Sequence, residues 1–69
     1  MLKKRSFSLA GHRTSVALEL EFWTVIEAES VRHGESLAAY VSRIDATRGE
    51  RPLASALRLA ALAAAKLAP

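Results

Sequence analysis

Polar and apolar residues alternate along residues 12–18, and this pattern predicts a half-buried β-strand. Successive side chains of an extended chain point to opposite faces. One face, directed toward a core, carries Thr14, Val16 and Leu18. The other face carries Arg13, Ser15 and Ala17. A cation, a hydroxyl and a methyl group in one row can hydrogen-bond guanine, contact either type of base and touch a thymine methyl group in a major groove.

The residues before this strand alternate more weakly, and they leave two structures open. Residues 1–11 form either a basic N-terminal arm or a short strand, because Gly11 permits a turn back onto the strand or a positive φ that directs the chain elsewhere. An isolated strand leaves its backbone groups unpaired, and no other stretch alternates as clearly. We therefore expect residues 12–18 to pair with the same strand of a second copy, as an antiparallel two-stranded ribbon.

Helical spacing of apolar residues predicts three helices after the strand. A helix over 20–32 has Phe22, Trp23 and Ile26 on one side and ends before Gly34. A helix over 36–48 begins at Ser36, whose side chain caps the first turn. An Ala-rich helix over 53–67 follows Pro52.

The predicted core joins the strand to the first two helices. Its members are the apolar residues that recur at strand or helix spacing: Val16, Leu18, Trp23, Ile26, Leu37, Tyr40, Val41 and Ile44. A chain of 69 residues buries only about 60% of its unfolded surface on folding, and this chain has no Cys to form disulfides. Oligomerisation is the remaining way to enlarge the core, so we expect a homodimer that shares it. The fold class is mainly α with a short β-strand, in one domain.

Positive charge is concentrated at the N-terminus. Residues 1–14 carry four cations and no acid, whereas the remainder carries six cations and seven acids. A basic pole beside a strand suits a polyanion such as double-stranded DNA. The expected phosphate contacts are Lys3, Lys4, Arg5, His12, Ser36 and Leu37, the last two through free backbone N–H groups at a helix start.

Residues that would support catalysis, a metal site or a cofactor are scarce in this chain. His12 and His33 are 21 positions apart, with no Cys and no carboxylate at ligand spacing. The sequence has no Gly-rich phosphate loop, and its Ser residues lack the context of a nucleophile. No apolar run reaches the length of a membrane span, and no signal peptide is evident. We therefore expect a cytoplasmic protein that is not an enzyme and binds no metal or cofactor.

Short segments throughout the chain resemble the ribbon-helix-helix DNA-binding proteins of bacteria. The resemblance extends from Lys4 to about Leu62 and is strongest in the string Gly-His-Arg-Thr-Ser-Val at 11–16. The other matching segments are Lys4-Arg5-Ser6, Leu18-Glu19, Phe22-Trp23, Ser36-Leu37, Ile44-Asp45 and Ala56-Leu57-Arg58.

The resemblance implies a homodimeric DNA-binding protein, either a transcriptional regulator or an antitoxin-like repressor. Carried over by position, Arg13, Ser15 and Ala17 face the major groove, while Ser36 and Leu37 clamp a phosphate. Glu35 departs from the family pattern, and its charge beside Ser36 opposes a phosphate. The alternative is a dimeric protein-interaction module that binds a partner on the helix at 53–67 or on the ribbon, because a fold alone does not determine function.

Overall fold

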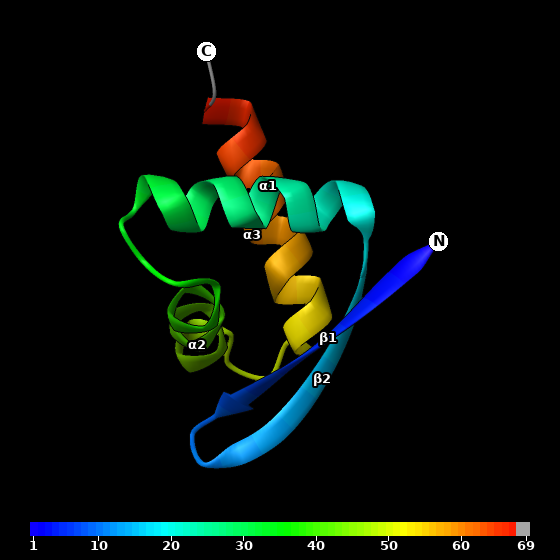
Figure 1. Ribbon diagram of the computed structural model, residues 1–69, viewed down its shortest axis with the longest axis vertical. Coiled ribbons are helices and arrows are strands. Elements are labelled where there is room, and N and C mark those ends of the chain that lie inside the picture. The colour runs from blue at the N-terminus through cyan, green and yellow to red at the C-terminus, as the bar shows by residue number, and fades with distance from the viewer. Residues whose placement is uncertain (68–69) are drawn as a thin grey trace.

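The computed structural model describes residues 1–67 as a β-hairpin followed by three helices (Figure 1). The elements in chain order are β1 (Leu2–Leu9), β2 (His12–Glu19), α1 (Leu20–Arg32), α2 (Leu37–Thr47) and α3 (Leu53–Leu67). In Figure 1, α1 crosses α3 and α2 is seen end-on. The two strands of the hairpin run diagonally through the lower right of the view, past the first turns of α3. This arrangement confirms the expected fold class.

Residues 2–9 form a strand and not an arm. Ala10 and Gly11 both have positive φ, 51° and 81°, which is the pattern of a two-residue type I′ turn. The turn folds β1 back onto β2 as an antiparallel pair that runs from Leu2 opposite Glu19 to Leu9 opposite His12. A two-stranded ribbon is therefore built within one chain, where the sequence analysis expected β2 to pair with the same strand of a second copy.

Trp23 of α1 connects the hairpin to the helices. Its side chain is fully buried, and its indole Nε1 donates a hydrogen bond of 2.7 Å to the main-chain oxygen of Lys3 in β1. The ring of Phe7 lies 6.1 Å from the Trp23 ring, centroid to centroid. A buried indole needs such an acceptor for its N–H group, and this one holds β1 against α1.

The core closes within a single chain. Six of the eight predicted core residues are buried, and the other two, Leu37 and Ile44, pack against them while half-buried. Additional buried side chains come from β1 and α3: Phe7, Leu9, Leu53, Ala56, Leu57 and Ala61. Because α3 packs against α1, α2 and β2, this helix completes the core of its own chain.

The turn between α1 and α2 is fixed by backbone hydrogen bonds and ion pairs. Gly34 has a φ of 68°, and the N–H groups of Gly34 and Glu35 donate to the main-chain oxygens of Val31 and Ser30. These two hydrogen bonds form the Schellman motif that ends a helix. Glu29, half-buried near the end of α1, accepts two hydrogen bonds from the Arg32 guanidinium.

The Ser36 cap and the carboxylate of Glu35 both stabilise the start of α2. Ser36 Oγ accepts a hydrogen bond of 3.1 Å from the Ala39 N–H, as its predicted capping role requires. Glu35 accepts hydrogen bonds of 2.7 and 3.2 Å from Arg43, whose guanidinium also lies 5.1 Å from the centroid of the Tyr40 ring. The hydrogen bond from Arg43 lowers the pKa of Glu35.

The left-handed backbone at Ala10 generates a prediction about stability. This conformation costs an L-residue roughly 1–2 kcal/mol, and Asn followed by Gly is preferred in a type I′ turn. We expect Ala10→Asn to raise the free energy of unfolding by about 0.5–1 kcal/mol. The melting temperature, followed by circular dichroism, should rise by roughly 2–8 °C. Ala63→Asn, the same change on the exposed side of α3, should lower it, and equal effects at both sites would contradict the turn assignment.

The ion pairs of the α1–α2 turn generate a prediction about pH. The folded protein lowers the pKa of Glu29 and Glu35 below the ordinary value of a glutamate through hydrogen bonds from Arg32 and Arg43. A lowered folded-state pKa adds stability above the unfolded pKa, and that stability is lost as the pH falls through the folded pKa. In urea titrations, the free energy of unfolding should therefore decrease as the pH falls from about 5 toward 3.

Glu35→Gln should flatten this decrease, because Gln cannot form the charge-assisted pair with Arg43. Glu50→Gln is the matched control, because Glu50 is exposed and forms no ion pair within residues 1–67. Superimposable profiles for Glu35→Gln and the unsubstituted protein would show that the Glu35–Arg43 pair does not stabilise the fold.

Candidate nucleic-acid interface

The hairpin has one face against the helices and one face away from them. The inward positions of β2 include Val16 and Leu18, which are buried, and those of β1 include Phe7 and Leu9, also buried. The opposite row runs from the pair Leu2 and Glu19 at the open end of the hairpin to the turn, and we call its remaining six residues the outer face: Lys4, Ser6, Ser8, Arg13, Ser15 and Ala17. All of these residues are exposed except Ala17, which is half-buried.

The strand register arranges the outer face as three cross-strand pairs. Arg13 lies opposite Ser8, and its Nη1 is 3.4 Å from Ser8 Oγ, a weak hydrogen bond. Ser6 and Ser15 lie opposite one another and are joined by a hydrogen bond of 2.9 Å between their hydroxyl groups. Lys4 lies opposite Ala17. The structure thus brings the predicted Arg13, Ser15 and Ala17 together on one exposed face.

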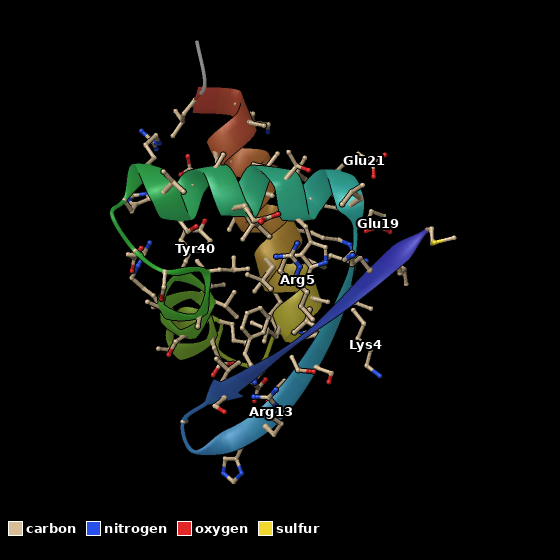
Figure 2. All side chains as sticks on the ribbon, in the orientation of Figure 1. Lys4, Arg5, Arg13, Glu19, Glu21 and Tyr40 are labelled. Carbon is tan, nitrogen blue, oxygen red and sulfur yellow. The ribbon has the colours of Figure 1, made fainter. Side chains whose placement is uncertain are left out.

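The cations of β1 do not all lie on this face. Arg5 points to the helix side, where its Nη2 is 3.2 Å from Glu27 Oε1 and its guanidinium lies 5.0 Å from the centroid of the Trp23 ring. Figure 2 shows Arg5 between the hairpin and α1, and Lys4 directed away from the helices. Lys3 and His12 are exposed but belong by alternation to the inward positions. Of the N-terminal cations expected to contact phosphate, only Lys4 lies on the outer face.

One acid, Glu19, stands at the end of β2, two positions after Ala17. Its Oε1 accepts a hydrogen bond of 3.0 Å from Nε of Arg58 in α3, and Nη2 of Arg58 lies 3.0 Å from the same oxygen as an ion pair. A backbone hydrogen bond, followed by the bond from Arg58, lowers the pKa of Glu19, so it is ionised at neutral pH. Arg58 also lies 5.8 Å from the centroid of the Phe22 ring. The negative charge nearest the outer face is therefore compensated by a cation from α3.

The start of α2 carries the other predicted phosphate contacts. Ser36 is exposed and Leu37 is half-buried, and the Ser36 hydroxyl is engaged as the helix cap. The neighbouring Glu35, which sequence reasoning placed in conflict with a phosphate, is paired with Arg43 on both carboxylate oxygens. The charge of Glu35 is thus paired with Arg43 of α2.

Sequence reasoning did not include Ser6 and Ser8 in this surface. Both lie on β1, which the weak alternation of residues 3–9 left as either an arm or a strand. The signal that would have found them is the same alternation, because Lys4, Ser6 and Ser8 are its polar positions.

Neither a metal-binding cluster nor a membrane-spanning helix is found among residues 1–67. The described residues contain no group of three or more His, Cys, Asp or Glu side chains placed to hold a metal ion. None of the helices over these residues has the length and apolar character to cross a membrane.

Comparison with known families identifies the chain. The model of the ribbon-helix-helix domain matches residues 2–65, a span that includes the hairpin and most of α3. Neither curated proteins nor solved structures gave a match. Members of this family are in general DNA-binding transcriptional regulators. The match covers nearly the whole chain, and the hairpin followed by helices agrees with it, so the chain belongs to the ribbon-helix-helix domain family.

Proposed function

We propose that this protein binds double-stranded DNA in a sequence-specific manner and acts as a small transcriptional regulator or antitoxin-like repressor. The observation that carries the proposal is the outer face of the hairpin, which is cationic and hydroxyl-rich and whose nearest acid, Glu19, is paired with Arg58. A two-stranded ribbon is narrow enough to enter the major groove. The helices lie on the opposite side of the hairpin and leave this face open.

Three residues of β2 are proposed to contact base edges. Arg13 offers two N–H donors to guanine O6 and N7, the commonest specific contact in the major groove. The Ser15 hydroxyl can donate to or accept from either type of base, and the Ala17 methyl group can pack on a thymine methyl group. All three lie on the outer face.

The phosphate contacts are proposed to flank this face. Lys3 and His12 are exposed near the two ends of the hairpin, and Ser36 and Leu37 place free backbone N–H groups at the start of α2. Arg5 is removed from this set, because its guanidinium is engaged by Glu27 and Trp23 on the helix side.

A homodimer remains part of the proposal. Within residues 1–67, each strand of the hairpin pairs only along the edge that it shares with the other strand. An open edge offers unpaired backbone donors and acceptors to a strand from a second copy.

Salt dependence tests the proposal most simply. In fluorescence anisotropy titrations of a labelled mixed-sequence duplex, we expect binding whose log K falls steeply and linearly with log salt, because phosphate contacts release counterions. Light scattering on the same samples should give the mass of a dimer. The absence of binding at low salt by a folded protein would refute DNA binding, and a monomer mass would refute the homodimer.

Arg13→Ala tests base recognition. On a duplex that the protein selects, the loss of a bidentate guanine contact should cost about 1–3 kcal/mol, with a much smaller loss on random duplexes. Arg51→Ala is the matched control, because it removes the same charge from an exposed position between α2 and α3. An equal loss on selected and random duplexes would show that Arg13 does not read bases.

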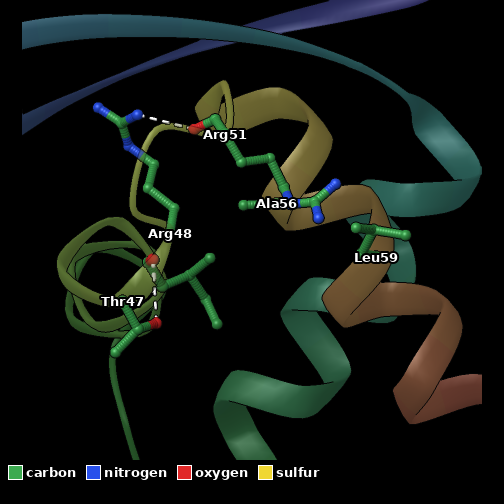
Figure 3. A pocket seen from close by; sticks show the side chains of 6 residues that line it. Thr47, Arg48, Arg51, Ala56 and Leu59 are labelled. Atoms are coloured by element: carbon green, nitrogen blue, oxygen red, sulfur yellow. Dashed lines mark hydrogen bonds between the residues drawn. The ribbon is translucent and has the colours of Figure 1, made fainter.

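A groove between α2 and α3 supports protein interaction as a second candidate function. Ile44, Thr47, Arg48, Arg51, Ala56 and Leu59 line it (Figure 3). Arg48 is held at the rim by hydrogen bonds of 2.7 Å to Asp45 and to the main-chain oxygen of Arg51. Leu59 and Leu62 on α3 are 46% and 49% exposed, so the core of this chain leaves part of these apolar side chains uncovered.

The double variant Leu59→Ser, Leu62→Ser tests this second function. Both side chains are half exposed, so the fold should persist and the affinity for DNA should stay within about twofold, an effect below 0.5 kcal/mol. A protein captured from cell extract by the unsubstituted chain should be lost with the variant if α3 is an interface. Capture of the same proteins by both chains would show that Leu59 and Leu62 of α3 do not form an interface with a protein partner.

A further inference from the structure

The outer face contains residues from both strands of one hairpin, and this extends the proposed DNA contact surface beyond β2. Lys4, Ser6 and Ser8 of β1 lie in the same exposed row as the proposed base contacts of β2. The major groove is about 12 Å wide and admits a two-stranded ribbon, whose strands lie about 4.8 Å apart. A single chain therefore carries both strands that a groove can hold.

We infer that the outer face of one hairpin is a complete recognition unit, in which Lys4 contacts a base edge and, together with Arg13, selects two guanines about four base-pair steps apart. This inference rests on the proposed DNA binding. It assigns Lys4 a different role from the sequence-independent phosphate contact expected of an N-terminal cation.

The spacing follows from the strand register. Arg13 lies opposite Ser8, and Lys4 is four residues from Ser8 along β1. At about 3.4 Å per residue, the two cations stand roughly 14 Å apart along the ribbon. Base pairs rise 3.4 Å per step along the duplex, so this distance corresponds to about four steps.

The chemistry of each cross-strand pair predicts how strongly each position is selected. Arg13 and Lys4 both prefer the O6 and N7 acceptors of guanine. Arg13 is 3.4 Å from Ser8 Oγ, and Lys4 forms no ion pair among the residues that the structure describes. Between them, the linked hydroxyls of Ser6 and Ser15 accept either type of base, so the intervening positions are weakly selected. Ala17, opposite Lys4, favours a thymine beside that guanine.

The neighbouring cations of β1 are excluded from this role by their positions. Arg5 is half-buried on the helix side and bound to Glu27. Lys3 is exposed but occupies an inward position of the strand, opposite Leu18. Lys3 is thus a matched control for Lys4, because it has the same charge and the adjacent position but lies off the outer face.

The experiment is selection of duplexes from a random library by the unsubstituted protein and by variants of Lys3, Lys4 and Arg13, followed by affinity measurements on the selected sequences. The unsubstituted protein should enrich two guanines about four steps apart. Lys4→Ala should lose one of them and Arg13→Ala the other, each with a roughly 5- to 150-fold drop in affinity for the selected duplex relative to random DNA. Lys3→Ala should keep both guanines and weaken all duplexes alike.

Each other outcome has a distinct meaning. If Lys4→Ala keeps both guanines and weakens all duplexes as Lys3→Ala does, Lys4 is a phosphate contact; the inference fails while DNA binding stands. If the unsubstituted protein binds no duplex, the proposed function fails and the inference with it. Lys4→Gln, which keeps a long polar side chain, should also lose the guanine, and circular dichroism of each variant verifies the fold.

Discussion

The contact between Trp23 and the first strand is the interaction on which the rest of the structure depends. The indole is fully buried and donates its one hydrogen bond to the main-chain oxygen of Lys3. Phe7 packs beside the indole ring, and the Arg5 guanidinium lies near its centroid. These contacts place the inner side of β1 against α1. Because strand side chains alternate, this placement also determines which residues of β1 face away from the helices.

The charges of the molecule are divided accordingly. Arg5, a cation on the inner side, is compensated by Glu27, whereas Lys4 and Arg13 on the outer face have no acid opposite them in the hairpin. Glu19, which directly precedes α1, and Glu35, which precedes α2, are each bound by an arginine: Glu19 by Arg58 and Glu35 by Arg43. The result is a positive outer face bordered by neutralised acids, which suits a polyanion.

The helices and the second strand could be predicted because their apolar residues recur at the period of the element. The strand expected over 12–18 corresponds to β2, and the helices expected over 20–32 and 53–67 coincide with α1 and α3. The helix expected over 36–48 is observed over Leu37–Thr47. Ser36 and Arg48 are its N-cap and C-cap, so the expected helix is one residue too long at each end.

The first strand could not be predicted with the same ease, because two of its inward positions, Lys3 and Arg5, are cationic. Arg5 is tolerated there because it contacts Glu27 and the Trp23 ring, partners from another element that no local pattern contains, and Lys3 is tolerated because its position is exposed. The candidate site was incomplete for the same reason: without β1 as a strand, Ser6 and Ser8 had no defined face. The place of α3 in the core also depends on tertiary packing, since Leu57 is fully buried against other elements of the same chain.

Chemical-shift mapping by NMR shows whether the outer face of the hairpin contacts duplex DNA. Labelled protein is titrated with a duplex while the backbone amide signals of the described residues are followed. If the outer face binds DNA, the largest changes cluster on its six residues, Lys4, Ser6, Ser8, Arg13, Ser15 and Ala17. The signals of Leu59 and Leu62 on α3 then change little. Changes confined to the groove between α2 and α3, or the absence of changes anywhere, would contradict DNA binding by the outer face.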